Sequence, residues 1–451
     1  MTEPRLDPIR VAAAAVDAAR QAGAEQAEAY VQFATQLDIQ VRNGAVERVR
    51  RAAGRGVGLR ATHDGRTAMV HTTDVAGIPM LQMAARVVEI ARALPAGAEV
   101  PIYALPGAVE PFPHPDPGLS AETLERRIGR LQEIERAMLA VAGVSRSGGA
   151  SWSETDGEIA LVNTSGLSLY APFCVIENAA EAIAERDGES YPGGRQVELP
   201  ARTLLPVAEA FGREAGHRAT EMLGARSLAS TRAPVVFTPR TGWTLLASLG
   251  GALRGDHVVR GRSYLAGRLG ERLAAPGVTL RDNPHRPASP GRRAFDAEGT
   301  PTRDLALVRE GRLEAYLTDL KSAAALGVAP GGHATRGSHA EGTEIGPSLF
   351  YMEPGPHTPE QILAECDRAL LVTQLSGWWV GLSPAHDQFS SAAMGIWIEK
   401  GEPAYPVRGI TIAGSLGEML AGIDRVGNDL EFTNRTTTPT FRVAEMAISG
   451  I

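Results

Sequence analysis

Cysteine is nearly absent from this sequence, since Cys174 and Cys366 are the only two among 451 residues and lie far apart. Two isolated thiols cannot form the disulfide framework of a small secreted domain, so we expect a reducing compartment. The opening MTEPRLDPIR has no apolar core of a secretory signal, and no run of about 18 apolar residues could span a membrane. These absences predict a soluble, cytoplasmic protein without a membrane partner.

The sequence also lacks an excess of positive charge, because its formal net charge is −7 at pH 7. Nucleic-acid affinity depends on a basic face that releases counterions from phosphates, so no nucleic-acid partner is expected. Among the 45 basic residues only Lys321 and Lys400 are lysines, an arginine bias that we attribute to a GC-rich genome. The hydrophobic fraction of 43% is ample for real cores, and the length predicts two or three domains.

Motifs for independent catalysis are missing as well. The sequence contains no H-E-x-x-H, and no two of its ten histidines stand four apart, the spacing that would place both on one helical face. The nearest pair, His333 and His339, lies in HATRGSHAEGTE, which we interpret as an exposed polar loop. No G-x-S-x-G and no phosphate-binding G-x-x-x-x-G-K-[ST] occur. The residues alone therefore predict no metal ligands, no nucleophile and no phosphate site.

Several other features favour structural interpretations. Cys366 is expected in the helix that starts at the capping box Thr358-Pro359-Glu360-Gln361, packed rather than reactive. The pair Gly250-Gly251 indicates close helix packing. Four carboxylates in EAIAERDGES predict a solvated turn at Asp187-Gly188, with a polar wall near a groove or a subunit contact as the alternative. They are Glu181, Glu185, Asp187 and Glu189.

The N-terminal part predicts helices packed on an antiparallel sheet. A first helix is expected after the cap Asp7, with Pro8 in its first turn and Gly23 at its end. Alternating apolar residues from 27 to 41 lead into Asn43-Gly44, and a second strand pair flanks Asp64-Gly65. Both dipeptides favour positive φ and predict tight hairpins. A second helix is expected over 75–94.

Proline is frequent over 95–119, which predicts an extended crossing segment. Ser120 is then expected to cap a long helix with one apolar stripe, and Asp156-Gly157 to turn a further hairpin. Another helix is expected near 203–224. From Ala233 onward, short strand-like runs and glycines dominate.

The fold class is therefore predicted to be α+β. We expect an N-terminal domain over 1–230, of antiparallel sheet with packed helices. We expect a β-rich C-terminal domain over 231–451, barrel-like or sandwich-like, with a few helices.

One long segment is much more specific than these patterns. Residues 295–336 read FDAEGTPTRDLALVREGRLEAYLTDLKSAAALGVAPGGHATR. This segment resembles the TldD/PmbA family, whose pattern joins Asp-x-Glu-Gly to a strand, a Glu/Asp-Gly turn, a second strand and a Gly-x-x-x-Arg. Further segments agree with the family in order along almost the whole chain. They are NGAVERVR, GVGLRA, NTSG, ERDGESYPGG, APGVTLRDNP and IEKGEPAYPVRGITIAG.

The resemblance implies a comparison with the catalytic branch of that family, which carries H-E-x-x-x-H on a helix and a cysteine ligand near the C-terminus. The corresponding window reads LASLGGA in either register, without histidine or glutamate, and His257 lies beyond it. No cysteine follows Cys366. The degenerate positions are Leu246, Ala247, Ser248, Leu249, Gly250, Gly251 and Ala252. Metal-assisted hydrolysis needs both an ion and a base, so the chain resembles the non-zinc PmbA/TldE branch, with no cofactor of its own.

The resemblance further implies a heterodimer with a TldD-like subunit that carries zinc, acting on extended or unfolded peptides. This chain would shape the substrate chamber, and strand addition could hold the peptide. Candidate groove or interface residues are Asp296, Glu298, Asp319, Arg336, Trp378 and Phe389. A homodimer, a regulatory protein of the gyrase-modulator type and an autonomous hydrolase with an unrecognised site remain open alternatives.

Overall fold

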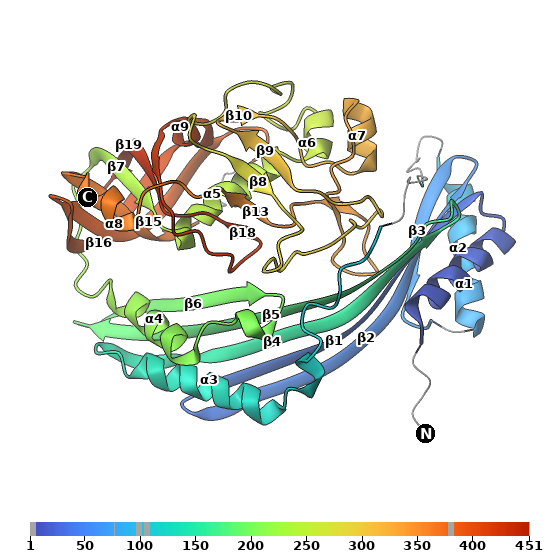
Figure 1. Ribbon diagram of the computed structural model, residues 1–451, viewed down its shortest axis with the longest axis horizontal. Helices are drawn as coiled ribbons and strands as arrows, with labels where there is room; N and C mark the ends of the chain where they lie inside the picture. The colour runs from blue at the N-terminus through green and yellow to red at the C-terminus, as the bar shows by residue number, and fades with distance from the viewer. Residues whose placement is uncertain (1–5, 76, 96–101, 103–108, 378–382, 451) are drawn as a thin grey trace.

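The computed structural model describes residues 6–75, 77–95, 102, 109–377 and 383–450. A long curved sheet from the N-terminal part of the chain faces a second body built around a barrel (Figure 1). Most of the expected crossing segment before residue 109 lies outside the described residues. No helix within the described ranges is long and apolar enough to cross a membrane.

The curved sheet has six strands in the order β3-β2-β1-β4-β5-β6, all antiparallel to their neighbours. The predicted hairpins at Asn43-Gly44 and Asp64-Gly65 are confirmed, with positive φ at both residues of each pair. The expected turn at Asp187-Gly188 is confirmed in the same way. The strands are β1 Gln26–Arg42, β2 Ala45–His63, β3 Arg66–Thr72, β4 Val144–Asn163, β5 Ser168–Arg186 and β6 Glu189–Leu199.

Asp156-Gly157 does not turn a hairpin, because β4 runs straight through it. A Cβ at Gly157 would lie 2.5 Å from the carbonyl oxygen of Phe33 and 2.8 Å from the ring of Phe173. This glycine is therefore required by the close approach of two neighbouring strands and not by a turn. The chain turns instead after Asn163, where Gly166 has a φ of 90°.

Helices cover the outer face of the curved sheet in two pairs (Figure 1). The first pair, α1 Pro8–Gln21 and α2 Gly77–Ala93, packs on the end near β3. The second pair is α3 Leu124–Leu139 and α4 Ala208–Thr220. Asp7 caps α1 as predicted, by accepting a hydrogen bond from the Ile9 N–H at 2.9 Å.

The cap of α3 differs from the prediction. Thr123 caps this helix by accepting from the Arg126 N–H at 3.3 Å, whereas Ser120 lies in the short 3-10 helix η1, Leu119–Ala121. Glu122 has an extended backbone and separates η1 from α3, so α3 begins only after this residue.

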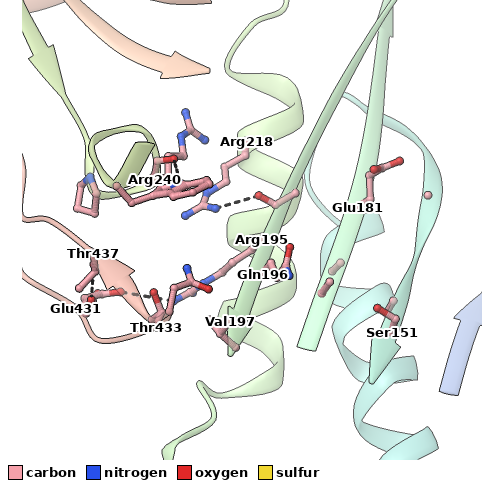
Figure 2. A pocket seen from close by; sticks show the side chains of 18 of the residues that line it. Ser151, Glu181, Arg195, Gln196, Val197, Arg218, Arg240, Glu431, Thr433 and Thr437 are labelled. Carbon is pink, nitrogen blue, oxygen red and sulfur yellow. Dashed lines mark hydrogen bonds and ion pairs between the residues drawn. The ribbon is translucent and has the colours of Figure 1, made fainter. Parts of the chain in front are cut away.

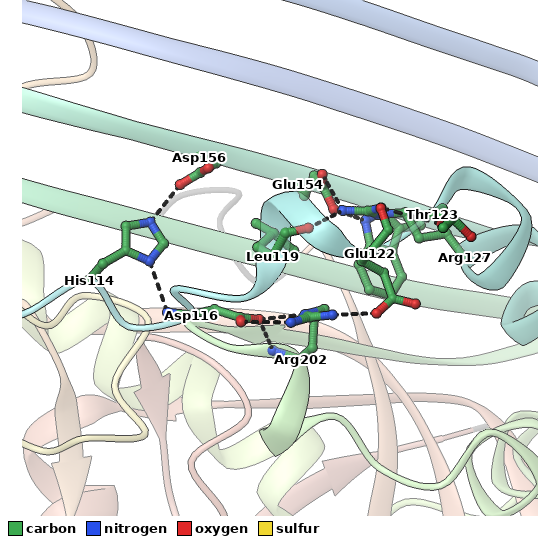
Figure 3. A network of polar contacts seen from close by, with 10 residues as sticks. His114, Asp116, Leu119, Glu122, Thr123, Arg127, Glu154, Asp156 and Arg202 are labelled. Atoms are coloured by element: carbon green, nitrogen blue, oxygen red, sulfur yellow. Dashed lines mark hydrogen bonds and ion pairs between the residues drawn. The ribbon is translucent and has the colours of Figure 1, made fainter.

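A polar network fixes the described end of the crossing segment onto the sheet (Figure 3). His114 accepts the Asp116 N–H through Nδ1, so its Nε2 carries the proton that it donates to Asp156 at 2.7 Å. Arg202 binds both oxygens of Asp116 at 2.8 and 3.1 Å. Burial opposes ionisation of Asp116, but these bonds from Arg202 hold its pKa below the usual value. The network ties residues 114–122 to β4 and to the chain that follows β6.

The main C-terminal sheet has six described strands, of which β7, β14, β15, β16 and β19 close into a barrel, while β17 pairs only with β19. The sheet order is β16-β15-β14-β7-β19-β17, and a further pairing of β16 with β19 closes the ring. The α+β class is thereby confirmed, with the barrel form of the two that the sequence left open. The strands are β7 Thr231–Phe237, β14 Arg368–Ser376, β15 Gln388–Glu399, β16 Glu402–Ser415, β17 Ile423–Val426 and β19 Phe441–Ser449.

A smaller sheet, in the order β10-β9-β8-β13-β18, packs beside the barrel. Its strands are β8 Leu280–Asp282, β9 Leu305–Arg309, β10 Arg312–Leu313, β13 Phe350–Met352 and β18 Thr436–Thr437, and a separate pair is β11 Ala334–Thr335 with β12 Glu344–Ile345. The helices of this part are α5 Pro239–Ala252, α6 Gly255–Val259, α7 Leu320–Leu326, α8 Pro359–Ala364 and α9 Leu416–Ala421. The capping box of α8 is confirmed, and buried Cys366 follows that helix rather than lying inside it. The division into domains 1–230 and 231–451 stays a prediction.

Candidate functional site

A cavity of about 800 Å³ separates the inner face of the curved sheet from the barrel body. Strands β4, β5 and β6 supply one wall, and the start of α5 together with residues 431–437 supplies the other (Figure 2). Arg195, Arg218 and Arg240 gather in this space with Glu181 and Glu431 at its margins. The sequence offered a polar groove wall as the alternative role of the carboxylates at 181–189. Of these four carboxylates, only Glu181 lines the cavity.

A second cavity, of about 590 Å³, adjoins the first at Arg240 and Trp243, which line both. Its floor is the α5 face that carries Ala247, Ser248 and Gly251. A third cavity, of about 260 Å³, shares lining residues with both of the others. We call these three adjoining cavities the groove. It runs from the inner face of the curved sheet to the middle of α5.

The two ends of the groove differ in polarity. At the sheet end, Arg195 and Arg218 both bind Glu214, and Arg240 binds Glu221. Burial lowers the pKa of Arg218, and the neighbouring Arg240 and Arg195 act in the same direction. The α5 end is mainly apolar, since it is lined by Trp243, Ala247, Gly251, Tyr264, Leu375, Pro384 and Leu416.

The window over 246–252 lies entirely within α5. Leu246, Leu249 and Ala252 point into the core and are at most 1% exposed. Ser248 faces the cavity, but its hydroxyl donates to the Thr244 carbonyl of the same helix at 2.8 Å. The cavity-facing positions of the window therefore offer small side chains and no strong metal donor.

The expectation of close helix packing at Gly250-Gly251 is wrong. Among the residues that the structure describes, a Cβ at Gly250 would meet nothing within 4 Å, and one at Gly251 would lie 3.6 Å from Pro384. Neither glycine is required by a close approach. Gly251 lines the groove, whereas Gly250 is buried and does not. His257 follows the helix, and its Nδ1 lies 2.8 Å from the Gly251 carbonyl oxygen.

The residues of the groove do not fit a zinc ion. Zinc sites use histidine, cysteine and carboxylate ligands, usually four in tetrahedral geometry or three with one open position. Within the described ranges, no group of three or more histidine, cysteine, aspartate or glutamate side chains is arranged to hold a metal ion. We therefore assign no metal-dependent step to this chain.

At the α5 end of the groove, one strand edge has no partner strand among the residues that the structure describes. Strand β14 pairs with β7 only from Leu370 to Val372, while its pairing with β15 continues to Ser376. Beyond Val372, residues Thr373, Gln374 and Leu375 line the cavities beside α5. An unpaired edge of this kind can add an extended peptide through main-chain hydrogen bonds.

Three of the predicted site residues stabilise the segment 295–336 itself. Asp296 accepts the N–H groups of Glu298 and Thr300 at 2.9 Å and that of Ala334 at 3.0 Å. Glu298 accepts the Leu320 N–H at 2.8 Å, and Asp319 caps α7 with a capping box. The structure brings these three carboxylates together, but outside the groove.

The other predicted residues also lie away from the groove. Arg336 is buried against Glu28 of the curved sheet, with their charged groups 3.1 Å apart. Phe389 is 5% exposed in the core of the barrel body. Trp378 lies outside the described residues.

Sequence reasoning missed Arg240, Trp243 and Thr373, which do line the groove. No sequence signal marks these residues, because the 41% exposure of Trp243 on α5 is revealed only by the structure.

The protein is a mixed α/β protein. Its curved half-barrel sheet faces a closed barrel, and the groove lies between them. Family models of the PmbA/TldA metallopeptidases match the chain in three parts. Their domain 1 matches residues 27–93, their central domain 117–223 and their C-terminal domain 230–450. The chain belongs to the PmbA/TldD family.

Several relatives match most of the chain. Metalloprotease PmbA of Escherichia coli O157:H7 is 28% identical, over 94% of this chain and 92% of its own. A metalloprotease TldD homolog of Haemophilus influenzae is 24% identical, over 90% of this chain and 86% of its own.

Two solved structures share the fold, each with a TM-score of 0.87. TldE from Thermococcus kodakarensis is 20% identical, with coverage of 96% of this chain and 99% of its own. A Thermotoga maritima protein described as a candidate modulator of a DNA gyrase is 22% identical, with coverage of 96% and 98%.

Proposed function

We propose that this chain is the non-catalytic, TldE-like subunit of a heteromeric zinc metallopeptidase that acts on extended or unfolded peptides. In this proposal a TldD-like partner carries the zinc, and this chain shapes the chamber in which the peptide lies. The observation that carries the proposal is the α5 window. The resemblance aligns this window with the ligand helix of the catalytic branch. Its side chains are small or apolar, and the Ser248 hydroxyl donates to a carbonyl of its own helix, on the floor of an open groove.

The groove supports the peptide-handling part of the proposal. Its α5 end combines apolar walls with the open edge of β14 at Thr373–Leu375, which suits an extended main chain with little demand on side-chain identity. Its sheet end presents arginines that already bind glutamates, so its charges are largely compensated. The scarcity of cysteine supports a cytoplasmic location for the complex.

The test is co-expression with a family member from the same genome that retains H-E-x-x-x-H. We expect zinc and cleavage of an unfolded peptide in the complex, and neither in this chain when it is purified alone. Zinc content by elemental analysis and peptide cleavage by mass spectrometry provide the two readouts. Stoichiometric zinc or cleavage with this chain alone would overturn the proposal, as would the absence of any complex.

A groove-filling variant tests the peptide-handling part separately. Ala247→Trp places a large ring in the 590 Å³ cavity and should raise the KM of the assembled peptidase several-fold without changing its zinc content. Ala324→Trp, at an exposed position of α7, is the matched control and should leave KM unchanged. Equal KM values for the two variants would show that the peptide does not use this groove.

A further inference from the structure

Strand β2 has a long open edge. It pairs with β1 along its whole length, but its pairing with β3 spans only Val57–His63. Within the described residues, Ala45–Gly56 has no strand partner on its second side. Side chains from Ala45 to Arg55 are exposed apart from half-buried Ala52, so neither face is covered up to Arg55. The ring of His339 covers Gly56, which is buried. This end of the sheet lies away from the barrel body (Figure 1). Proteins rarely leave such an edge bare unless charge protects it or a partner covers it.

The open edge carries net positive charge, although one of its arginines, Arg50, stands directly opposite Asp38 of β1. Between Ala45 and Arg55 the sequence has four arginines and one glutamate, so the formal charge is +4 − 1 = +3. Glu47 faces Arg42 across the hairpin at 3.5 Å. The guanidinium groups of the four arginines form no hydrogen bond or ion pair with any residue that the structure describes, unlike those of the groove. They are Arg48, Arg50, Arg51 and Arg55.

The arginines are distributed over both faces of the strand. Alternation places Arg48 and Arg50 on one face and Arg51 and Arg55 on the other, because successive side chains of a strand point to opposite sides. Val49 lies on the same face as Arg51, opposite Ile39 of β1, and is 44% exposed. The edge thus presents positive charge on both faces of the strand and an apolar side chain, Val49, on one of them.

We infer that the open edge of β2 over 45–56 docks an acidic edge strand of the zinc-bearing partner subunit and extends the curved sheet across the subunit boundary. The inference rests on the proposed function for the identity of that partner. A strand laid along this edge presents side chains on both faces, opposite all four arginines, and could neutralise each of them. Opposite charges in directly facing pairs stabilise a sheet, whereas like charges destabilise it.

The same charges argue against two other occupants. A second copy of this chain, paired edge to edge, would bring two sets of four arginines together. A nucleic-acid backbone needs one continuous basic surface, and these arginines point to opposite faces of a strand in a chain with net charge −7. An acidic protein strand satisfies both constraints.

The experiment compares two triple variants of the full chain, each co-expressed with the zinc-bearing family member. The edge variant is Arg48→Glu/Arg50→Glu/Arg51→Glu, and the control is Arg86→Glu/Arg213→Glu/Arg232→Glu. The control arginines are at least 61% exposed and pair with acids elsewhere on the surface, so the change of net charge is matched. We expect the edge variant to bind the partner at least about tenfold more weakly than the control, the equivalent of about 1.4 kcal/mol. Wild-type affinity should fall as salt rises.

The outcomes separate this inference from the proposed function. A complex that forms equally well with both variants would overturn the docking edge and leave the proposed function intact. If the wild-type chain forms no complex, both fail. A short DNA duplex and the chain itself serve as further probes. Loss of duplex binding or of self-association in the edge variant, with an unchanged heterodimer, would assign the edge to that other occupant and overturn the inference. Thermal melts of the isolated variants establish that each is folded.

Discussion

Glu28→Gln is expected to lower the free energy of unfolding by about 3–5 kcal/mol, the cost of removing one partner from a buried ion pair. Glu28 lies on β1 between two guanidinium groups, Arg60 of β2 at 3.2 Å and Arg336 at 3.1 Å. The side chains of Glu28 and Arg336 are each 2% exposed. Without the carboxylate, two buried positive charges would face each other in a medium that screens them poorly.

The surroundings make this cluster sensitive. The Nε atoms of Arg60 and Arg336 are buried and have no hydrogen-bond partner within the described part of the chain, so both guanidinium groups lack one acceptor there. Burial lowers the pKa of Arg336, which Glu28 opposes and Arg60 reinforces. The guanidinium carbon of Arg336 also lies over the ring of Tyr30, 4.9 Å from its centroid.

Urea unfolding of the wild type and the variant would measure the difference. Glu89→Gln is the control, because Glu89 pairs with Arg86 on the surface at 3.3 Å, with both side chains more than half exposed. Its loss should change the unfolding free energy by less than about 1 kcal/mol. A Glu28→Gln variant that behaves like this control would contradict the assignment of Glu28 as the compensating charge.

The position of the cluster shows what such a loss would affect. Arg336 ends the segment 295–336, whereas Glu28 and Arg60 belong to the curved sheet. The chain just after Arg336 crosses the same strands, since a Cβ at Gly58 would lie 2.1 Å from the His339 carbonyl oxygen. The family-like segment and the chain just after it therefore connect the C-terminal part of the protein to the curved sheet.

Local signals in the sequence predicted local structure well. The Asp7 cap, the turns at Asn43-Gly44 and Asp64-Gly65 and the capping box at Thr358 depend on neighbouring residues alone, and all are present. Gly157 misled the same reasoning. Asp156-Gly157 resembles a turn dipeptide but lies in the middle of β4. A glycine is needed at 157 because Phe33 and Phe173, which are far from it in sequence, leave no space for a side chain.

The candidate site was harder to predict, because a specific pattern does not reveal whether its residues bind a ligand or hold the fold. Asp296, Glu298 and Asp319 resemble groove carboxylates in sequence, yet each accepts main-chain N–H groups in the interior of the segment. The lining of the groove comes from segments far apart in the chain, such as Arg218, Arg240 and Thr373. Arginine is also so frequent that no cluster stands out from the sequence alone.

Glu298→Gln is expected to remove a loss of stability that the wild type suffers as pH rises. Burial raises the pKa of Glu298 from 4.5 to about 7, and Asp296 and Asp319 act in the same direction. The folded chain therefore holds this proton more tightly than the unfolded chain, and stability falls as pH rises from the unfolded pKa through the folded one. A shift of this size corresponds to about 3 kcal/mol in total, most of it lost between pH 5 and pH 8.

The difference in unfolding free energy between the wild type and Glu298→Gln isolates this effect. His333, whose pKa burial lowers to about 3, destabilises the folded state as pH falls below about 6.5, which is the opposite trend. That contribution is the same in both proteins and cancels in the difference. We expect the stability of the wild type relative to the variant to fall by about 2–3 kcal/mol from pH 5 to pH 8, measured by urea unfolding at each pH. A pH-independent difference would mean that Glu298 is ionised in the fold across this range. The Leu320 N–H and Arg60 would then stabilise its charge more than burial opposes it.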